Sequence, residues 1–217
     1  MTSSQLLLIF DMDGTIIQSK IDYMGMRDRL KEILQDIVNE EEYQKIRQAI
    51  YTILELVLMI KERDSSGEIY KKAWEIVEKY ELKGYEEAFV EEGVLETLRK
   101  LKKKGHILVI YTNNSRKITD FALPKYNFNN IFEYVLTRDE VEHSKPNPEG
   151  IFFLMQKFQK ETSSTIFIGD SWVDAETALN AKIEFIYYGS EGAPGTRRKK
   201  IDSSHIISSM TELLNLY

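Results

Sequence analysis

The first apolar run of the sequence, Leu6 to Phe10, stops abruptly at Asp11. A short and continuous apolar run is typical of a strand that is buried on both faces, as strands of parallel sheets are. Similar runs follow at His106 to Tyr111, Phe132 to Leu136, Thr165 to Ile168 and, more weakly, Glu184 to Tyr188. Helical spacings or turn residues separate these later runs, so the chain is predicted to form an α/β structure with a mainly parallel sheet.

A long interval between the first two runs breaks this alternation. It contains no convincing strand, and its apolar residues recur at helical spacing in three stripes. The stripes cover Ile33 to Val38, Ile46 to Leu58 and Ile69 to Val77. Such stripes bury one another more readily than they bury a ligand, so the interval is predicted to be an all-helical subdomain inserted after the first strand. The predicted domains are 1–17 with 89–217 for the sheet core and 18–88 for the helical insertion.

Short polar signals mark two of the expected helix ends. Ser65 and Ser66 precede Glu68 and offer a start for the helix of the third stripe. After the insertion, a helix from Val94 to Lys104 is predicted to lead the chain back to the sheet. Gly105 ends that helix, because glycine readily adopts the left-handed conformation that closes a helix.

Two aspartates follow the first predicted strand, in the segment Asp11-Met12-Asp13-Gly14-Thr15. Open α/β sheets bind ligands at the carboxyl ends of their strands. The glycine permits a sharp turn and lets backbone amides approach an anion. A plain Asp-Gly turn is the alternative, but two carboxylates at the end of a buried strand favour a functional site.

Polar groups also follow the second strand and precede the fourth. Thr112 and Asn113 come directly after the second strand, where a hydroxyl and the amides that follow it could donate to a phosphoryl oxygen. Lys145 precedes Pro146 in a constrained turn and could bring a positive charge to a developing anion. An ordinary strand exit and a solvated surface lysine are the alternatives for these segments.

The fourth strand ends in Gly169-Asp170-Ser171-Trp172-Val173-Asp174, so a second pair of carboxylates stands at a strand end. Asp170 and Asp174 could face one point if a helical turn begins at Ser171. A helix start with Asp170 as its N-cap is the alternative. Taken alone, this segment supports both interpretations equally.

Together these segments predict one site at one edge of the sheet. Its acidic side chains repel one another by about 1 kcal/mol per pair at about 4 Å in water, and by more near protein. A divalent cation and Lys145 would offset that repulsion. Oxygen ligands without cysteine or clustered histidine favour Mg²⁺ over zinc. The acidic residues of the predicted metal site are Asp11, Asp13, Asp170 and Asp174.

Composition excludes several other classes of function. The net charge is −6 and the pI about 5.3, which argues against non-specific binding to nucleic acid. The short basic run from Arg197 to Lys200 is predicted to be a solvated loop. There are no cysteines, no signal peptide is apparent, and the most apolar stretch is too short for the roughly 20 residues that span a bilayer. A cytoplasmic protein without membrane or nucleic-acid partners is expected.

The four segments, in this order at strand ends, resemble the motifs of the haloacid dehalogenase-like superfamily. The matching residues are Asp11-x-Asp13-Gly14-Thr15, Thr112, Lys145-Pro146 and Gly169-Asp170-x-x-x-Asp174. The helical insertion directly after the first motif resembles the cap of the phosphoglycolate phosphatase-like branch. The resemblance implies a Rossmann-like parallel core with an inserted helical cap, and a magnesium-dependent phosphatase acting on a small phosphorylated metabolite.

The resemblance also implies a role for each motif residue. Asp11 would attack phosphorus and form an aspartyl phosphate, and Asp13 would act as general acid and then general base. Thr112 and Lys145 would hold the transferring oxygens, with Gly14 and Asn113 also at the substrate. Magnesium would be bound by the Asp11 side chain, the Asp13 carbonyl and Asp170, with Asp174 in support.

Two other functions stay open at this point. A sugar phosphomutase shares the same four motifs and returns the phosphoryl group to a second hydroxyl. A non-catalytic phospholigand-binding protein would be favoured by degraded motifs, and here every motif position is intact. Dehalogenase activity is disfavoured by Asp13, since a halide leaving group needs no proton. The helical insertion is expected to close over the site and to select the substrate, with hinges near 16–18 and 88–92.

Overall fold

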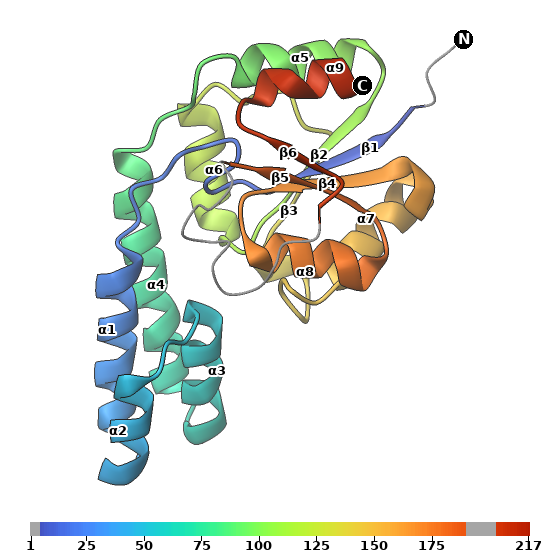
Figure 1. The fold of residues 1–217 in the computed structure, drawn as a ribbon. Helices are drawn as coiled ribbons and strands as arrows, with labels where there is room; N and C mark the ends of the chain where they lie inside the picture. The colour runs from blue at the N-terminus through green and yellow to red at the C-terminus, as the bar shows by residue number, and fades with distance from the viewer. Residues whose placement is uncertain (1–4, 190–202) are drawn as a thin grey trace. The chain divides into compact units, whose positions relative to one another are not determined.

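The computed structural model describes residues 5–189 and 203–217, and the chain divides into two compact units (Figure 1). One unit comprises the chain up to Ser19 together with Ala88–Tyr217, and the other comprises Lys20–Glu87. The basic run from Arg197 to Lys200, predicted to be a loop, lies outside the described residues.

Within the described ranges, the first unit is built on a sheet of six parallel strands. Their order across the sheet is β3-β2-β1-β4-β5-β6. The strands are β1 (Leu7–Phe10), β2 (Ile107–Tyr111), β3 (Tyr134–Leu136), β4 (Thr165–Gly169), β5 (Glu184–Tyr188) and β6 (His205–Ile207). The prediction of a parallel α/β core is therefore confirmed.

The first strand occupies a central position between β2 and β4. Phe10 is level with Ile110 of β2 and with Ile168 of β4, so the three strands end side by side. All four residues of β1 are buried, as expected of a strand covered on both faces. This register brings the polar segments that follow β1, β2 and β4 to one edge of the sheet.

Two details of the sheet differ from the sequence prediction. The third strand begins at Tyr134 and not at Phe132, because Phe132 packs its ring against Phe10 and Phe128 before the strand starts. The strand β6 was not predicted. It has three residues, and two of them are exposed, so it lacks the apolar run that identifies a buried strand.

Helices cover the sheet on both faces, with α5 and α9 on one side and α7 and α8 on the other (Figure 1). Between α7 or α8 and the sheet lies a core that includes Leu7, Tyr111 and Phe167. The helices of this unit are α5 (Val94–Lys103), α6 (Arg116–Lys125), α7 (Glu149–Phe158), α8 (Trp172–Ala181) and α9 (Leu213–Leu216). Gly105 follows α5 with φ of 95°, which confirms the predicted helix end.

The second unit is all helical, and its own core is formed by apolar residues of its four helices. They are α1 (Tyr23–Gln35), α2 (Glu40–Gln48), α3 (Ile53–Arg63) and α4 (Glu68–Glu86). The periodicity predicted one helical stripe from Ile46 to Leu58, but the structure divides this stretch between α2 and α3. Thr52 and Glu55 form a capping box that begins a new helix, while Lys31 donates to the carbonyls at the end of α2.

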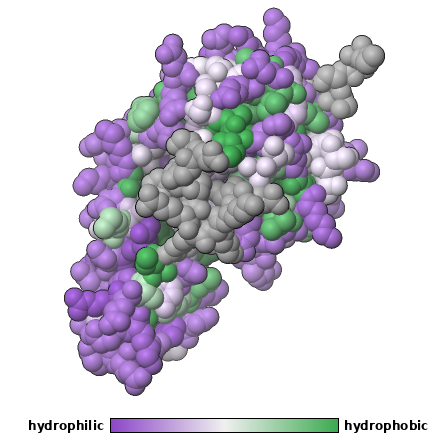
Figure 2. Space-filling model, in the orientation of Figure 1, coloured by the Kyte–Doolittle hydropathy of each residue, from purple (hydrophilic) through white to green (hydrophobic). Residues whose placement is uncertain are grey.

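The surface of the helical unit is largely hydrophilic in the view of Figure 2, which fits amphipathic helices that bury their apolar stripes against one another. No helix within the described parts of the chain combines the length and the apolar character needed to span a bilayer.

His106, just before β2, is a buried titratable group of the sheet unit. Its Nδ1 accepts a hydrogen bond from the backbone N–H of Leu6 at 3.2 Å, and its ring lies edge-on to Tyr217. Burial lowers the pKa of His106 below its ordinary value of 6.5, and the charges of Lys104 and Lys160 lower it further. The fold therefore favours the neutral ring.

We predict that His106 makes the fold less stable in mild acid. The unfolded chain takes up the proton at higher pH than the folded chain does. Above pH 6.5, His106 therefore does not lower the free energy of unfolding. As the pH falls below that value, protonation of the unfolded chain reduces this free energy. His106→Asn keeps an acceptor for the Leu6 N–H. In urea unfolding at about pH 7.5 and about pH 5.5, the variant should lose less stability than the wild type. Equal losses would contradict the prediction.

Candidate active site

Asp11 is the first residue after β1, at the edge where the central strands end. Its backbone N–H donates to the carbonyl of Ile168 at 2.9 Å, which ties the residue to the end of β4. Only 6% of Asp11 is exposed. The carboxylate is therefore held on a fixed backbone in a place largely closed to water.

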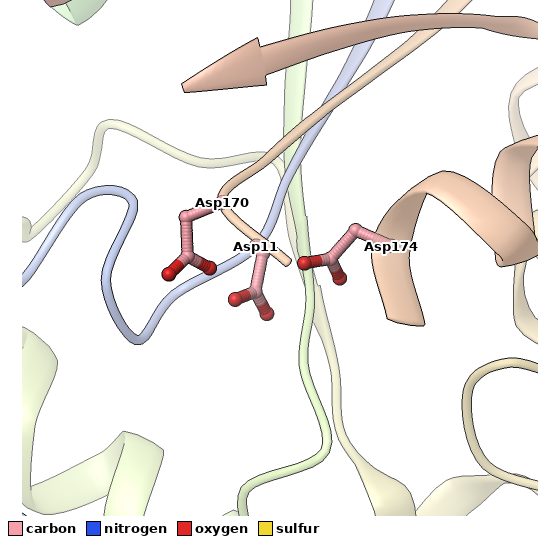
Figure 3. A group of neighbouring side chains, drawn as sticks. All are labelled: Asp11, Asp170 and Asp174. Carbon is pink, nitrogen blue, oxygen red and sulfur yellow. The ribbon is translucent and has the colours of Figure 1, made fainter. Parts of the chain in front are cut away.

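Three carboxylates converge at this edge (Figure 3). Asp11 follows β1, Asp170 follows β4, and Asp174 projects from α8. Each offers an oxygen that lies within 4.8 Å of the oxygens of the other two. Of the four aspartates predicted to converge, Asp11, Asp170 and Asp174 do so with their side chains.

Asp174 is fixed by the first turn of α8. Ser171 is the N-cap of this helix, and Asp174 completes a capping box by accepting from the N–H and the hydroxyl of Ser171. The alternative in which Asp170 caps the helix is therefore wrong. Because Ser171 has the N-cap position, Asp170 stays outside the helix and can face Asp11. The Ser-x-x-Asp spacing was visible in the sequence, but the role of Ser171 was not inferred from it.

Lys145 bridges two of these carboxylates, Asp11 and Asp174. Its ammonium donates to Asp11 Oδ1 at 2.7 Å and to Asp174 Oδ1 at 2.6 Å, and only 3% of the residue is exposed. The same nitrogen lies 5.6 Å from the ring centroid of Tyr111 and 5.4 Å from that of Phe167. Both distances are within the range of cation–π attraction. The contribution of these two rings was not predicted, because the sequence shows them only as core residues.

Burial and mutual repulsion shift the ionisation of the whole group. Burial raises the pKa of Asp11 to about 7, with Lys145 opposing the shift and Asp174 adding to it. Burial also raises the pKa of Asp170 well above its usual range, and the charges of Asp174, Asp11 and Asp13 reinforce it. Burial works against the charge on Lys145, but Asp11 and Asp174 outweigh it and raise its pKa. Perturbed groups in one place are typical of functional sites.

Two glycines allow the carboxylates to approach one another. Gly14 has φ of 77°, and a Cβ built on it would lie 2.2 Å from Asp170 Oδ2. A Cβ on Gly169 would lie 2.6 Å from the Cβ of Asp174. Any larger residue at Gly14 would therefore be strained in its backbone and would displace Asp170.

The remaining predicted residues have distinct surroundings. Thr112 is buried, and its hydroxyl accepts from the N–H of Asn114 at 3.2 Å, which leaves its proton for donation elsewhere. Asp13 is half-buried and close enough for its charge to act on Asp170, but its side chain is not part of the three-carboxylate group. The side chain of Asn113 forms its two hydrogen bonds with the backbone of Lys145.

The donor set of this group suits a hard divalent cation. Among the described residues, three carboxylates face a single ammonium, which leaves excess negative charge in a buried place, and a cation would balance it. The ligands available from Asp11, Asp170 and Asp174 are all oxygens.

Comparison with known proteins assigns the family. A model of haloacid dehalogenase-like hydrolases matches residues 8–188, a span that includes every motif described above. The chain belongs to the haloacid dehalogenase-like hydrolase family. The resemblance inferred from the four motifs is therefore confirmed.

Relatives of this haloacid dehalogenase-like hydrolase include phosphatases. A phosphoglycolate phosphatase of Pseudomonas savastanoi pv. phaseolicola is 26% identical over 181 residues, covering 82% of this chain and 66% of the relative. The pyrophosphatase PpaX of Halalkalibacterium halodurans is 30% identical over 127 residues, covering 58% of each chain. The chain thus spans about two thirds of the Pseudomonas relative and somewhat less of PpaX.

A solved structure shows the same fold. The subfamily IA hydrolase of this superfamily from Geobacter sulfurreducens superposes with a TM-score of 0.63 at 24% identity, covering 98% of this chain and 96% of the other. At this identity the similarity establishes the architecture, in which a parallel α/β core carries an inserted helical unit.

We predict that Lys145→Met strongly destabilises the metal-free protein. The substitution keeps most of the apolar stem but leaves Asp11 and Asp174 buried without a counter-charge, which costs about 3–5 kcal/mol in comparable buried ion pairs. Unfolding by urea in the presence of a chelator should reveal the loss. Lys103→Met, at an exposed position of α5, is the matched control and should change stability by less than about 0.5 kcal/mol.

The double variant Lys145→Met with Asp11→Asn separates charge from packing. Removing the Asp11 charge should recover part of the stability lost in Lys145→Met, because both substitutions act on the same ion pair between Lys145 and Asp11. Strictly additive losses would contradict the electrostatic explanation.

Proposed function

We propose that this haloacid dehalogenase-like hydrolase is a magnesium-dependent phosphatase that acts on a small phosphomonoester through an aspartyl-phosphate intermediate. The observation that carries the proposal is the meeting of Asp11, Asp170 and Asp174 at the carboxyl edge of the sheet, where the ammonium of Lys145 pairs with Asp11 and Asp174. Phosphatases among the relatives support the reaction class.

Asp11 is suited to be the nucleophile. An oxygen of its carboxylate would attack phosphorus, forming an O–P bond while the bond from phosphorus to the substrate oxygen breaks. Its backbone is fixed at the end of β1, and Lys145 orients the side chain through the Oδ1 contact. Positioning of this kind accounts for much of the catalysis of phosphoryl transfer.

Asp13 is suited to move the proton. It would donate a proton to the departing substrate oxygen, and then accept one from the water that attacks the aspartyl phosphate, releasing inorganic phosphate and restoring Asp11. Thr112 would donate its hydroxyl proton to an oxygen of the transferring group, and Lys145 would supply positive charge beside it.

Magnesium would be held by the carboxylates of Asp11 and Asp170, with the carbonyl of Asp13 as the family resemblance implies. When bound, the cation would lower the repulsion between the nucleophile and an anionic substrate. Asp174 would support the site by holding Lys145, since both of its oxygens already accept hydrogen bonds.

The substrate class that we propose is a small phosphorylated metabolite, either phosphoglycolate-like or sugar-phosphate-like. The role of the helical unit in selecting it stays a prediction. A sugar phosphomutase is distinguished by its product, since it returns the phosphoryl group to a second hydroxyl of the sugar. Assaying hexose phosphates for both inorganic phosphate and the isomerised sugar phosphate separates the two activities.

We predict that Asp11→Asn lowers phosphate release by at least about a thousandfold, because it removes the nucleophile while keeping the shape of the side chain. The measurement is inorganic phosphate released from a panel of small phosphomonoesters with MgCl₂, with and without chelator. Chelator should abolish release by the wild type.

The control for this experiment is Asp120→Asn, on the exposed face of α6, which should retain wild-type turnover. Undiminished turnover by Asp11→Asn on a substrate that the wild type hydrolyses would refute the nucleophile assignment. Release of phosphate that is insensitive to chelator would refute the metal requirement.

We also predict that magnesium stabilises the fold through Asp170. A cation at about a hundred times its Kd stabilises the protein that binds it by about 2.7 kcal/mol, which corresponds to a rise in Tm of about 5–10 °C. Thermal unfolding with and without MgCl₂ measures this rise. Asp170→Asn should abolish most of it while Asp120→Asn keeps it. A rise of the same size in all three proteins would place the cation elsewhere.

A further inference from the structure

The side-chain amide of Asn113 forms two hydrogen bonds with the backbone of one residue, Lys145. Its Nδ2 donates to the carbonyl of Lys145 at 3.0 Å, and its Oδ1 accepts from the N–H of Lys145 at 3.1 Å. The two residues are 32 positions apart in the sequence. The amide therefore pairs with both backbone groups of Lys145, in the manner of a strand neighbour.

The backbone of Asn113 is itself held in place. Its carbonyl accepts from Nη1 of Arg138 at 2.8 Å, and the side chain of Arg138 is only 7% exposed. Asn113 also follows Thr112, whose N–H donates to Leu136 at the end of β3. The amide that holds Lys145 thus projects from a segment anchored to the sheet edge.

The ammonium of Lys145 requires a fixed position. It donates hydrogen bonds to Asp11 Oδ1 at 2.7 Å and to Asp174 Oδ1 at 2.6 Å. It also lies within cation–π distance of the rings of Tyr111 and Phe167. A displacement of about 1 Å at a catalytic group can lower a rate by about a hundredfold. The turn that carries Lys145 contains no regular helix or strand, and the bonds of Asn113 to the N–H and the carbonyl of Lys145 connect that turn to the sheet edge.

We propose that Asn113 is a positioning residue, whose amide fixes the backbone of Lys145 so that the ammonium bridges Asp11 and Asp174. The sequence hypothesis that Asn113 contacts the substrate stays a separate prediction, because the two bonds to Lys145 use one of the two side-chain N–H groups and leave the role of its backbone N–H untouched. The catalytic part of the inference rests on the proposed phosphatase function. The structural part, that the amide holds Lys145, does not.

The decisive variant is Asn113→Ala, which removes both bonds. We expect kcat to fall by about ten- to a hundredfold with KM changed by less than about threefold, because the variant loses the placement of a group that acts in the transition state. Hydrogen exchange of the Lys145 amide, followed by NMR, should accelerate by about tenfold, since the amide has lost its acceptor.

Two further variants keep the test sharp. Asn113→Asp retains an acceptor for the Lys145 N–H but has no donor for its carbonyl, so amide protection should persist while kcat falls. Asn180→Ala is the matched control, because Asn180 Nδ2 donates at 3.1 Å to the carbonyl of Pro146, one residue further along the same turn. This control should keep kcat within about twofold of the wild type.

The possible outcomes separate the two proposals. A rise in KM with unchanged kcat and unchanged Lys145 exchange in Asn113→Ala would overturn the positioning role and favour direct substrate contact. An equal loss of kcat in Asn180→Ala would also overturn it, since any weakening of the turn would then suffice. In a third outcome, the wild type releases phosphate from no substrate while Asn113→Ala still accelerates exchange of the Lys145 amide. The phosphatase proposal would then fail, but the conclusion that the Asn113 amide holds the backbone of Lys145 would stand.

Discussion

The buried ion pairs of Lys145 with Asp11 and Asp174 are the interaction on which the rest of the site depends. Removing charges from water is expensive, and a buried ion pair often stabilises a fold no better than apolar residues of the same size would. Here a single ammonium serves two carboxylates, a third carboxylate lies beside them, and the four residues come from three segments that are far apart in the sequence. Such a group is better explained by the chemistry it allows than by stability.

The parallel sheet makes this concentration of charge possible. Because β1 lies between β2 and β4 and all three end level with one another, the segments that follow them meet without long excursions. Backbone contacts then refine the approach. Gly14 admits Asp170, and the capping box of Ser171 turns Asp174 toward Lys145 while leaving Asp170 outside the helix. Sheet order brings the segments together, and local turn chemistry sets the final distances.

The sequence predicted the parts of the molecule that leave a periodic or positional signal. Buried strands ending in Asp11 and Asp170 gave the parallel core and the edge that holds the site. The edge strand β6 was missed because it is short and half exposed, and the break between α2 and α3 because apolar spacing continues across it. The pairing of Asn113 with Lys145 links positions 32 residues apart, which no local pattern reveals.

The different hydrogen bonding of the three aspartates argues for a division of roles within the site. Asp174 is completely buried, and its oxygens accept from Lys145 and from Ser171. It therefore acts best as a fixed negative charge that holds the ammonium. Asp11 also accepts from that ammonium, and it stands two residues before Asp13, the residue proposed to move the proton. Asp170 is outside the α8 helix and receives the repulsion of all three other carboxylates. Among these groups, Asp170 gains most from a cation, because no ion pair with a basic side chain neutralises it among the described residues.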